Sequence, residues 1–200
     1  MPSPVLHCAV GAAIYSLRRG SLGRKRGRLA GLIIIAALLP DIDFLPGLIV
    51  GDPNRFHNGP THSILFAILA AGMLTWLAGR QAGSAARQAG PAGRQRISVF
   101  ILTLFAGLSH PLLDGLAVDE RAPFGVPIFW PVSDLRFQVE DPWFDGIDHG
   151  STGAEASEFF DAIISVGNAK AMAKEFGIGA VAIGIGCWIG RRRRSRDETE

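Results

Sequence analysis

Residues 37–63 read ALLPDIDFLPGLIVGDPNRFHNGPTHS, in which a short polar loop separates two long apolar segments. Asp41 and Asp43 stand in the outer part of the first segment, and His57 and His62 stand just before the second. Hydrocarbon cannot solvate ionisable side chains, so such residues beside a membrane-spanning segment are rare and usually mark a site. These residues therefore predict half of a metal site at the edge of a membrane bundle.

The chain contains five apolar segments, residues 4–17, 29–50, 64–79, 97–118 and 176–190. About twenty apolar residues cross a bilayer, so 29–50 and 97–118 are long enough, whereas 4–17 is short. A length of 200 residues suits one domain. We therefore expect a single all-α domain over 1–200, a polytopic membrane helical bundle with four to five apolar helices. A soluble helical protein is the alternative.

Charge predicts how these helices cross the membrane. Fifteen of the twenty basic residues fall in three clusters, residues 18–28, 80–96 and 191–196. Loops rich in Lys and Arg favour the cytoplasm, which places the 191–200 tail inside and the long loop 119–175 outside. This loop carries eleven acids and four bases. We expect it to form an acidic extracytoplasmic insertion that contains an amphipathic helix over 155–165.

The basic clusters, the N-terminal segment and the cysteines exclude several other functions and features. The basic clusters need no role beyond orientation and contact with membrane lipids, so no nucleic-acid partner is expected. Positive charge follows residues 4–17 instead of preceding them, so we expect this segment to be retained and not cleaved as a signal peptide. Cys8 and Cys187 have no CxxC spacing and are expected to be small buried hydrophobes. Oligomeric state is not indicated.

Under the predicted topology the polar residues inside the apolar segments gather at one membrane face. Imidazole nitrogen and carboxylate oxygen together suit zinc, with manganese or iron as alternatives. We expect the metal ligands to be His7, Asp41, Asp43, His57, His62, His110 and Asp114. Of these, Asp43 and Asp114 are the candidates to bridge ions or orient the attacking water, and so to be catalytic.

Local geometry supports parts of this set. His110 and Asp114 are four residues apart and share one face of a helix, although Pro111 predicts a kink or a fresh helix start at His110. Asp41 and Asp43 are two apart, so broken backbone near the prolines is needed to aim both at one site. Thr61 is expected to cap the third apolar helix.

Each candidate ligand also has an ordinary structural interpretation. Asp41 and Asp43 could cap a helix or face the membrane interface, and His62 could bond to backbone at a helix N-terminus. His57 could be a solvated loop residue, and His110 and Asp114 could form a structural pair between helices. His7 is the weakest candidate, because an ordinary buried histidine explains it almost as well. We expect His149, in Asp148-His149-Gly150, to be a solvated loop residue.

Three short motifs that contain the candidate ligands occur in a fixed order, and together they are specific enough to indicate a family. Leu39-Pro40-Asp41-Ile42-Asp43, then His57 and Thr61-His62-Ser63, then Ser109-His110-Pro111-Leu112-Leu113-Asp114 resemble the YdjM-like family. Its members are bacterial inner-membrane proteins described as metal-dependent hydrolases, some of them regulated by LexA. The resemblance covers roughly residues 1–135 and includes His7. Asn58 departs from it, because the family usually has Arg there, and the substitution removes an anion contact that Arg could make.

The resemblance implies hydrolase activity at the inner membrane, and the topology predicted from the basic loops places the site on the periplasmic side. Lipid head groups are abundant there, so a phosphoester or ester of a lipid or other amphiphile is the expected substrate. A transport protein that relays protons or metal ions is the first alternative, although the inner halves of the apolar segments carry almost no polar residues. A non-catalytic membrane interaction protein is the second, but it does not explain why His and Asp gather at one face.

Overall fold

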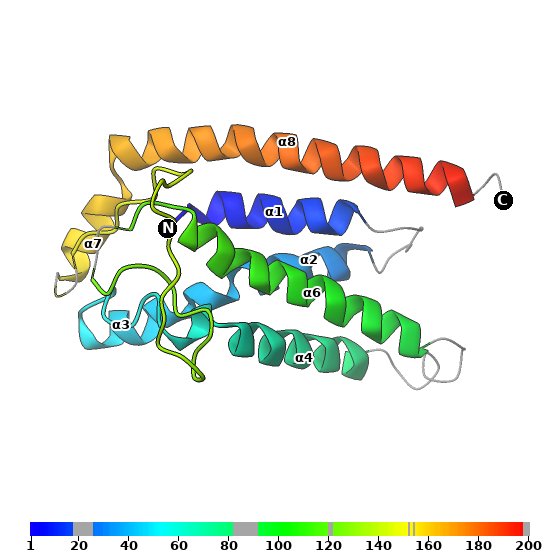
Figure 1. The fold of residues 1–200 in the computed structure, drawn as a ribbon, viewed down its shortest axis with the longest axis horizontal. Helices are drawn as coiled ribbons and strands as arrows, with labels where there is room; N and C mark the ends of the chain where they lie inside the picture. Colours follow the sequence, from blue (N-terminus) through cyan, green and yellow to red (C-terminus); the bar gives the residue numbers. More distant parts are fainter. Residues whose placement is uncertain (18–25, 82–91, 120–121, 152, 154, 198–200) are drawn as a thin grey trace.

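The computed structural model describes residues 1–17, 26–81, 92–119, 122–151, 153 and 155–197 (Figure 1). Most of the basic clusters expected at 18–28 and 80–96 lie outside these residues, as does the end of the 191–200 tail. The described chain is all helical, with isolated bridges in place of strands. This confirms the predicted all-α fold class.

The described residues form nine helical elements. They are α1 (Pro4–Ser16), α2 (Arg26–Leu38), the 3₁₀ turn η2 (Leu39–Asp43), α3 (Phe44–Val50), the 3₁₀ turn η3 (Pro60–His62), α4 (Ile64–Gln81), α6 (Ala92–Gly115), α7 (Ala156–Ile163) and α8 (Val166–Asp197). Each expected apolar segment lies in this series, and the expected amphipathic helix is α7.

The apolar helices lie roughly side by side along the length of the molecule (Figure 1). α1 packs between α8 and α2, and α6 packs against α1, α2 and α4. The core between α2, α4 and α6 is built from Leu29, Ile33, Ala36, Ala37, Leu74, Val99 and Ala106. Several of these side chains are small, which lets helices approach closely where van der Waals packing must hold them together.

In the part of the chain that the structure describes, three helical stretches are long and apolar enough to cross a membrane, namely Gly27–Val50, Gln95–Gly115 and Val166–Arg192. Pro4–Ser16 and Ile64–Arg80 are shorter apolar helices. Together they match the four to five apolar helices expected. Large apolar side chains such as Leu69, Phe105 and Val181 are exposed on the outside of the bundle, as is typical of helices that face lipid.

The two ends of the bundle differ. α3, α7 and the start of α8 lie at one end, with the chain that follows α6 (Figure 1). The end of α4, the start of α6 and the end of α8 lie at the other, where Arg80 stacks on Trp76 at 4.4 Å and Arg192 on Trp188 at 4.1 Å. Arginine and tryptophan are typical of a membrane interface.

Three local expectations were wrong in whole or in part. Of the two outcomes expected at Pro111, the fresh helix start was wrong, because α6 continues through Pro111 to Gly115. The hydroxyl of Ser63, not that of Thr61, caps α4 by accepting the N–H of Phe66 at 3.1 Å. The polar stretch before residue 176 is not all loop, because α8 already begins at Val166. Its Glu175 is buried and accepts hydrogen bonds from the N–H, at 2.8 Å, and the hydroxyl of Ser3 before α1.

Candidate metal centre

The candidate centre begins at a break in the second apolar segment. α2 ends at Leu38, and the chain continues as η2 with Pro40 in its first positions. Proline has no N–H, so the carbonyl of Ala37, three residues earlier, lacks the donor that a 3₁₀ turn would supply. That carbonyl instead lies 2.6 Å from Nδ1 of His110 on α6. The break in one helix therefore orients an imidazole on another.

Two imidazoles and two carboxylates meet beside this turn. Nε2 of His110 lies 3.2 Å from Oδ1 of Asp41 and 3.2 Å from Oδ2 of Asp114. Nε2 of His62 lies 3.3 Å from the same Asp114 oxygen and 3.8 Å from the same Asp41 oxygen. α6 presents His110 and Asp114 on one face, while η2 and η3 supply the other two. The predicted cluster is thus built from three separate elements.

Contacts on the side of each ring that faces away from the centre decide which ring nitrogen carries the proton. Nδ1 of His110 donates to the Ala37 carbonyl, and Nδ1 of His62 lies 3.2 Å from Oδ2 of Asp43. An ionised carboxylate and a carbonyl only accept, so the proton of each ring belongs on Nδ1. Each Nε2 then directs a lone pair at carboxylate oxygens. Such an arrangement repels itself unless a proton or a metal cation lies between the groups.

The residues present fit a divalent metal ion. In tetrahedral sites zinc lies about 2.0–2.1 Å from nitrogen and oxygen, which separates neighbouring ligand atoms by roughly 3.3 Å. Three of the four distances from His62 and His110 to the carboxylates, 3.2, 3.2 and 3.3 Å, match this separation, and the fourth, from His62 to Asp41, is longer at 3.8 Å. The Ala37 carbonyl and Asp43 also supply the outer hydrogen bonds that metal-bound histidines usually make.

Asp43 forms a second cluster on the other side of His62. Its Oδ1 lies 3.1 Å from Nδ1 of His57, and its Oδ2 accepts the hydroxyl of Thr61 at 2.9 Å. Burial lowers the pKa of His57, against the opposing effect of the hydrogen bond to Asp43, which favours the neutral ring that a metal needs. Asp43, His57 and His62 could hold a metal ion of their own, or Asp43 could orient both rings.

His7 joins the centre from α1 and is completely buried. Its ring stacks on that of His110, with 3.8 Å between centroids, and its Nε2 lies 3.4 Å from Oδ1 of Asp114. Neither of its ring nitrogens has a hydrogen-bond partner among the described residues. All seven predicted residues therefore lie in three overlapping groups: His7, His110 and Asp114; Asp41, His62 and His110; and Asp43, His57 and His62.

One residue near the centre was placed wrongly from sequence. His149 was expected to be solvated, but only 4% of it is exposed. Its ring meets that of His57 edge to face, with 5.2 Å between centroids, and that of Phe44 at 5.6 Å. The side chain of Asn54 holds its carbonyl at 2.7 Å. An isolated histidine in a polar loop gives no periodic or spacing signal that could have revealed this position.

Comparison with protein families decides what the chain is. The family model described as YdjM inner membrane protein matches residues 1–191. The chain belongs to the YdjM inner membrane protein family. Searches of curated proteins and of solved structures found no match. Membership agrees with the three candidate spans and establishes a membrane protein of the YdjM family.

Asn58 is the position at which this YdjM protein lacks the arginine expected from the family. Asn58 has a positive φ of 56°. A guanidinium nevertheless reaches this turn, because Nη2 of Arg136 donates to the Asn58 carbonyl at 2.7 Å and to the Gly125 carbonyl at 2.7 Å. Arg136 thus ties the chain after α6 to the turn that carries His57.

Proposed function

We propose that this chain is a membrane-bound metal-dependent hydrolase that cleaves a phosphoester or ester of a lipid or other amphiphile. The observation that carries the proposal is the convergence of two Nε2 lone pairs, from His62 and His110, on the carboxylates of Asp41 and Asp114. Mixed nitrogen and oxygen donors suit zinc, with manganese or iron as alternatives.

The residues divide into those that would hold metal and those that would orient them. Asp41, His62, His110 and Asp114 would form the main ligand set, with His7 beside it. A bound divalent ion supplies Lewis acidity, polarising a phosphoryl or carbonyl oxygen and lowering the pKa of water toward neutrality. Asp43 would fix the tautomer of His62 and His57, through the contacts of 3.2 and 3.1 Å described above.

Access favours one carboxylate for contact with substrate. The side chain of Asp41 is 16% exposed, compared with 5% for Asp43 and 1% for Asp114. Asp41 is therefore the carboxylate that an incoming molecule or its attacking water would meet first. Asp114, buried among three imidazoles, suits the bridging role expected for it. Asp43 remains a catalytic candidate only through the rings that it orients.

We further propose that the centre faces the periplasm. Arg80, Arg96, Arg191 and Arg192 belong to helix ends at the end of the bundle opposite α3 and α7 (Figure 1). Positive charge favours the cytoplasmic side. The centre lies toward the α3 end, because η2 and η3 carry three of its residues, Asp41, Asp43 and His62, and His57 lies in the turn just before η3. A lipid head group in the outer leaflet would then be within its reach.

The test combines metal content with turnover. Protein purified in detergent and loaded with zinc should contain bound metal by elemental analysis and should hydrolyse bis(p-nitrophenyl) phosphate. His110→Ala should lose metal and turnover together, whereas Asp134→Asn, an exposed acid outside the centre, should keep both. Metal content unchanged in His110→Ala would overturn the proposed centre. Stoichiometric metal without hydrolysis of phosphodiesters or carboxylic esters would overturn the hydrolase proposal and favour transport or a non-catalytic role.

A further inference from the structure

A groove of about 520 Å³ lies between α4 and α6, at the end of the bundle opposite the metal centre (Figure 1). Its lining consists of Thr75, Trp76, Gly79 and Arg80 from α4 and Arg96 from α6. Pockets for small ligands usually enclose about 300–1,000 Å³. The groove is therefore large enough for the head group of a lipid.

Contacts with α4 position both arginines of the groove. The guanidinium of Arg80 stacks on the ring of Trp76, with 4.4 Å from its carbon to the ring centroid. Arg96 reaches across from α6 to Gly79, where an added methyl group would lie 3.3 Å from Nη2. The guanidinium of Arg96 therefore lies beside the residue next to Arg80 in the chain.

The two helices bring no carboxylate to balance these charges. Residues 53–113, which include α4, α6 and the segment that joins them, contain no Asp or Glu. Every ion pair among the described residues involves other groups. Two neighbouring positive charges repel each other, and an anion between them removes that repulsion.

The hydroxyl of Thr75 in the same groove also lacks a partner. Its oxygen is buried and has no hydrogen-bond partner in the part of the chain that the structure describes. A threonine inside a helix can donate its hydroxyl to a carbonyl of the preceding turn, as Thr103 does to Val99 at 2.8 Å. Thr75 makes no such bond, so it has a donor for an acceptor oxygen in the groove.

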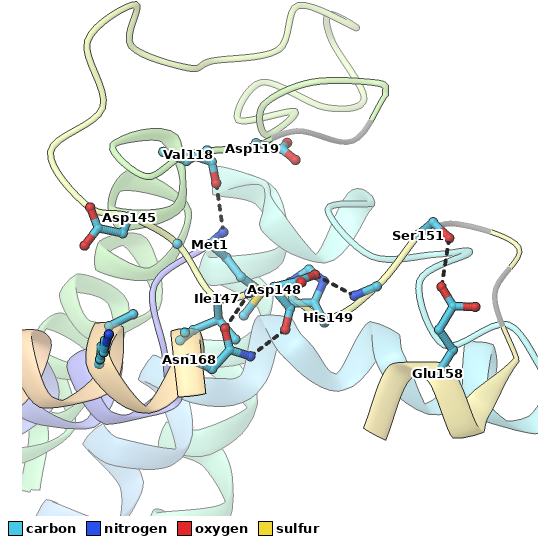
Figure 2. A pocket seen from close by; sticks show the side chains of 15 residues that line it. Met1, Val118, Asp119, Asp145, Ile147, Asp148, His149, Ser151, Glu158 and Asn168 are labelled. Carbon is cyan, nitrogen blue, oxygen red and sulfur yellow. Dashed lines mark hydrogen bonds between the residues drawn. The ribbon is translucent and has the colours of Figure 1, made fainter. Parts of the chain in front are cut away.

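The cleft of about 610 Å³ at the α7 end differs in the balance of its charges (Figure 2). Asp145 in its lining pairs with Lys174 at 2.9 Å. The N-terminal residue Met1 and Lys170 also line that cleft, beside its acidic residues. Charge of a single sign thus distinguishes the groove between α4 and α6 from this cleft.

An apolar strip on the outside of α4 leads away from the groove. Leu69, Met73 and Trp76 precede Arg80 at intervals of three or four residues, which places them on one face of the helix, and all three are exposed. Positive charge at the helix end and apolar surface along its length together match an amphiphile. A free phosphate would match only the charge.

We propose that this groove binds the phosphodiester of an anionic membrane lipid, with Arg80, Arg96 and Thr75 as donors and the acyl chains along the exposed face of α4. Basic pockets between membrane helices are suited to acidic head groups. Guanidinium is the preferred cation for phosphate, because two of its N–H groups match two phosphate oxygens. The lipid is a bound partner and not the substrate, since the metal centre lies at the other end of the bundle.

Competition between two lipids tests the proposal. Full-length protein in detergent is mixed with equal amounts of phosphatidylglycerol and phosphatidylcholine that carry the same acyl chains, and the bound lipids are counted by native mass spectrometry. The wild type should prefer phosphatidylglycerol. Arg80→Gln combined with Arg96→Gln should lower this preference by about fivefold for each arginine removed. Thr75→Val, which keeps the shape and removes the donor, should lower it as well.

A matched control removes the same charge from the same end of the bundle. Arg191 and Arg192 are exposed on α8 outside the groove, and Arg192 also stacks on a tryptophan, Trp188, at 4.1 Å. Arg191→Gln combined with Arg192→Gln should leave the preference unchanged. An equal loss in both double variants would show a general attraction between basic residues and acidic lipids, and would overturn the groove as a site.

Three further results would overturn the proposal. They are equal binding of the two lipids by the wild type, an undiminished preference in the variant of Arg80 and Arg96, and an undiminished preference in Thr75→Val. Excess inorganic phosphate should leave the lipid bound, and displacement would identify a small anion as the ligand in place of a lipid. Circular dichroism should show wild-type helix content in every variant. None of these measurements depends on hydrolase activity, so the groove and the proposed function can fail separately.

Discussion

Replacement of Asp43 by Asn separates an orienting carboxylate from a metal ligand. The carboxylate has three contacts, with Thr61 Oγ1 at 2.9 Å, His57 Nδ1 at 3.1 Å and His62 Nδ1 at 3.2 Å. An amide of the same shape has only one acceptor oxygen. Its NH₂ group would face a ring N–H or the Thr61 hydroxyl, so at least one imidazole would lose its acceptor. With the NH₂ group in place of Oδ2, the proton of His62 would be free to move to Nε2, the atom expected to hold metal; in place of Oδ1, the same would hold for His57.

The magnitude follows from the kind of contact that is lost. Removing a hydrogen-bond partner behind a metal-bound histidine typically lowers metal affinity about 10- to 100-fold, equivalent to roughly 1.4–2.7 kcal/mol. We therefore expect Asp43→Asn to weaken zinc by this amount. Asp114→Asn should weaken it further, because that carboxylate lies 3.2–3.4 Å from nitrogens of three histidines, His7, His62 and His110.

Zinc affinity is measured by competition with a chromophoric chelator in detergent, with Asp134→Asn as the control that should match wild type. Circular dichroism should show the same helix content in all four proteins, so that a loss of affinity is not a loss of fold. An affinity of Asp43→Asn equal to that of Asp114→Asn would mean that Asp43 is itself a ligand. An affinity equal to wild type would refute the orienting role.

Two further predictions concern how α1 and α8 hold together. A methyl group at Gly190 would collide with the Ser16 carbonyl of α1, whereas a methyl group at Gly184 would meet nothing within 4 Å. Gly190→Ala should therefore lower stability, measured by thermal unfolding in detergent, by about 1–3 kcal/mol, and the control Gly184→Ala should leave it unchanged. Equal melting temperatures would contradict the packing. Glu175→Ala should lower stability by about 1–3 kcal/mol, because it leaves the buried N–H and hydroxyl of Ser3 without their acceptor. The control Glu155→Ala, at an exposed position, should leave stability unchanged. A double-mutant cycle of Glu175→Ala with Ser3→Ala that shows no coupling energy would argue against this contact.

The sequence predicted the helices and the residues of the cluster because both have strong local signals. Apolar length revealed the helices, and the cost of placing ionisable groups among them singled out Asp41, Asp43, His110 and Asp114. Prolines correctly indicated the broken backbone at η2. At Pro111 the expected fresh helix start was wrong, because α6 packs against α2 and α4 and continues as one helix there, although proline alone disfavours it.

Other features could not be predicted because they depend on contacts between distant segments. The burial of His149 follows from its packing against Phe44 and from the hydrogen bond to Asn54. The charge of Glu175 suggested a residue in a solvated loop. It is instead a buried residue of α8, where its carboxylate accepts hydrogen bonds from two donors of Ser3. Asp41 is proposed as a metal ligand and Asp43 as the residue that orients the histidines. These roles depend on which histidine nitrogen each carboxylate contacts, and the spacing of the two residues in the sequence does not reveal those contacts.

The hydrogen bond from His110 to the Ala37 carbonyl gives Pro40 a chemical importance beyond breaking a helix. An ordinary residue at position 40 would bring an N–H that competes for the same oxygen, and the ring on α6 would lose its fixed proton without any change in its own sequence. Positions 40 and 110, seventy residues apart, should therefore evolve as a pair. A relative that loses this proline would be expected to have lost, or rebuilt, its imidazole there as well.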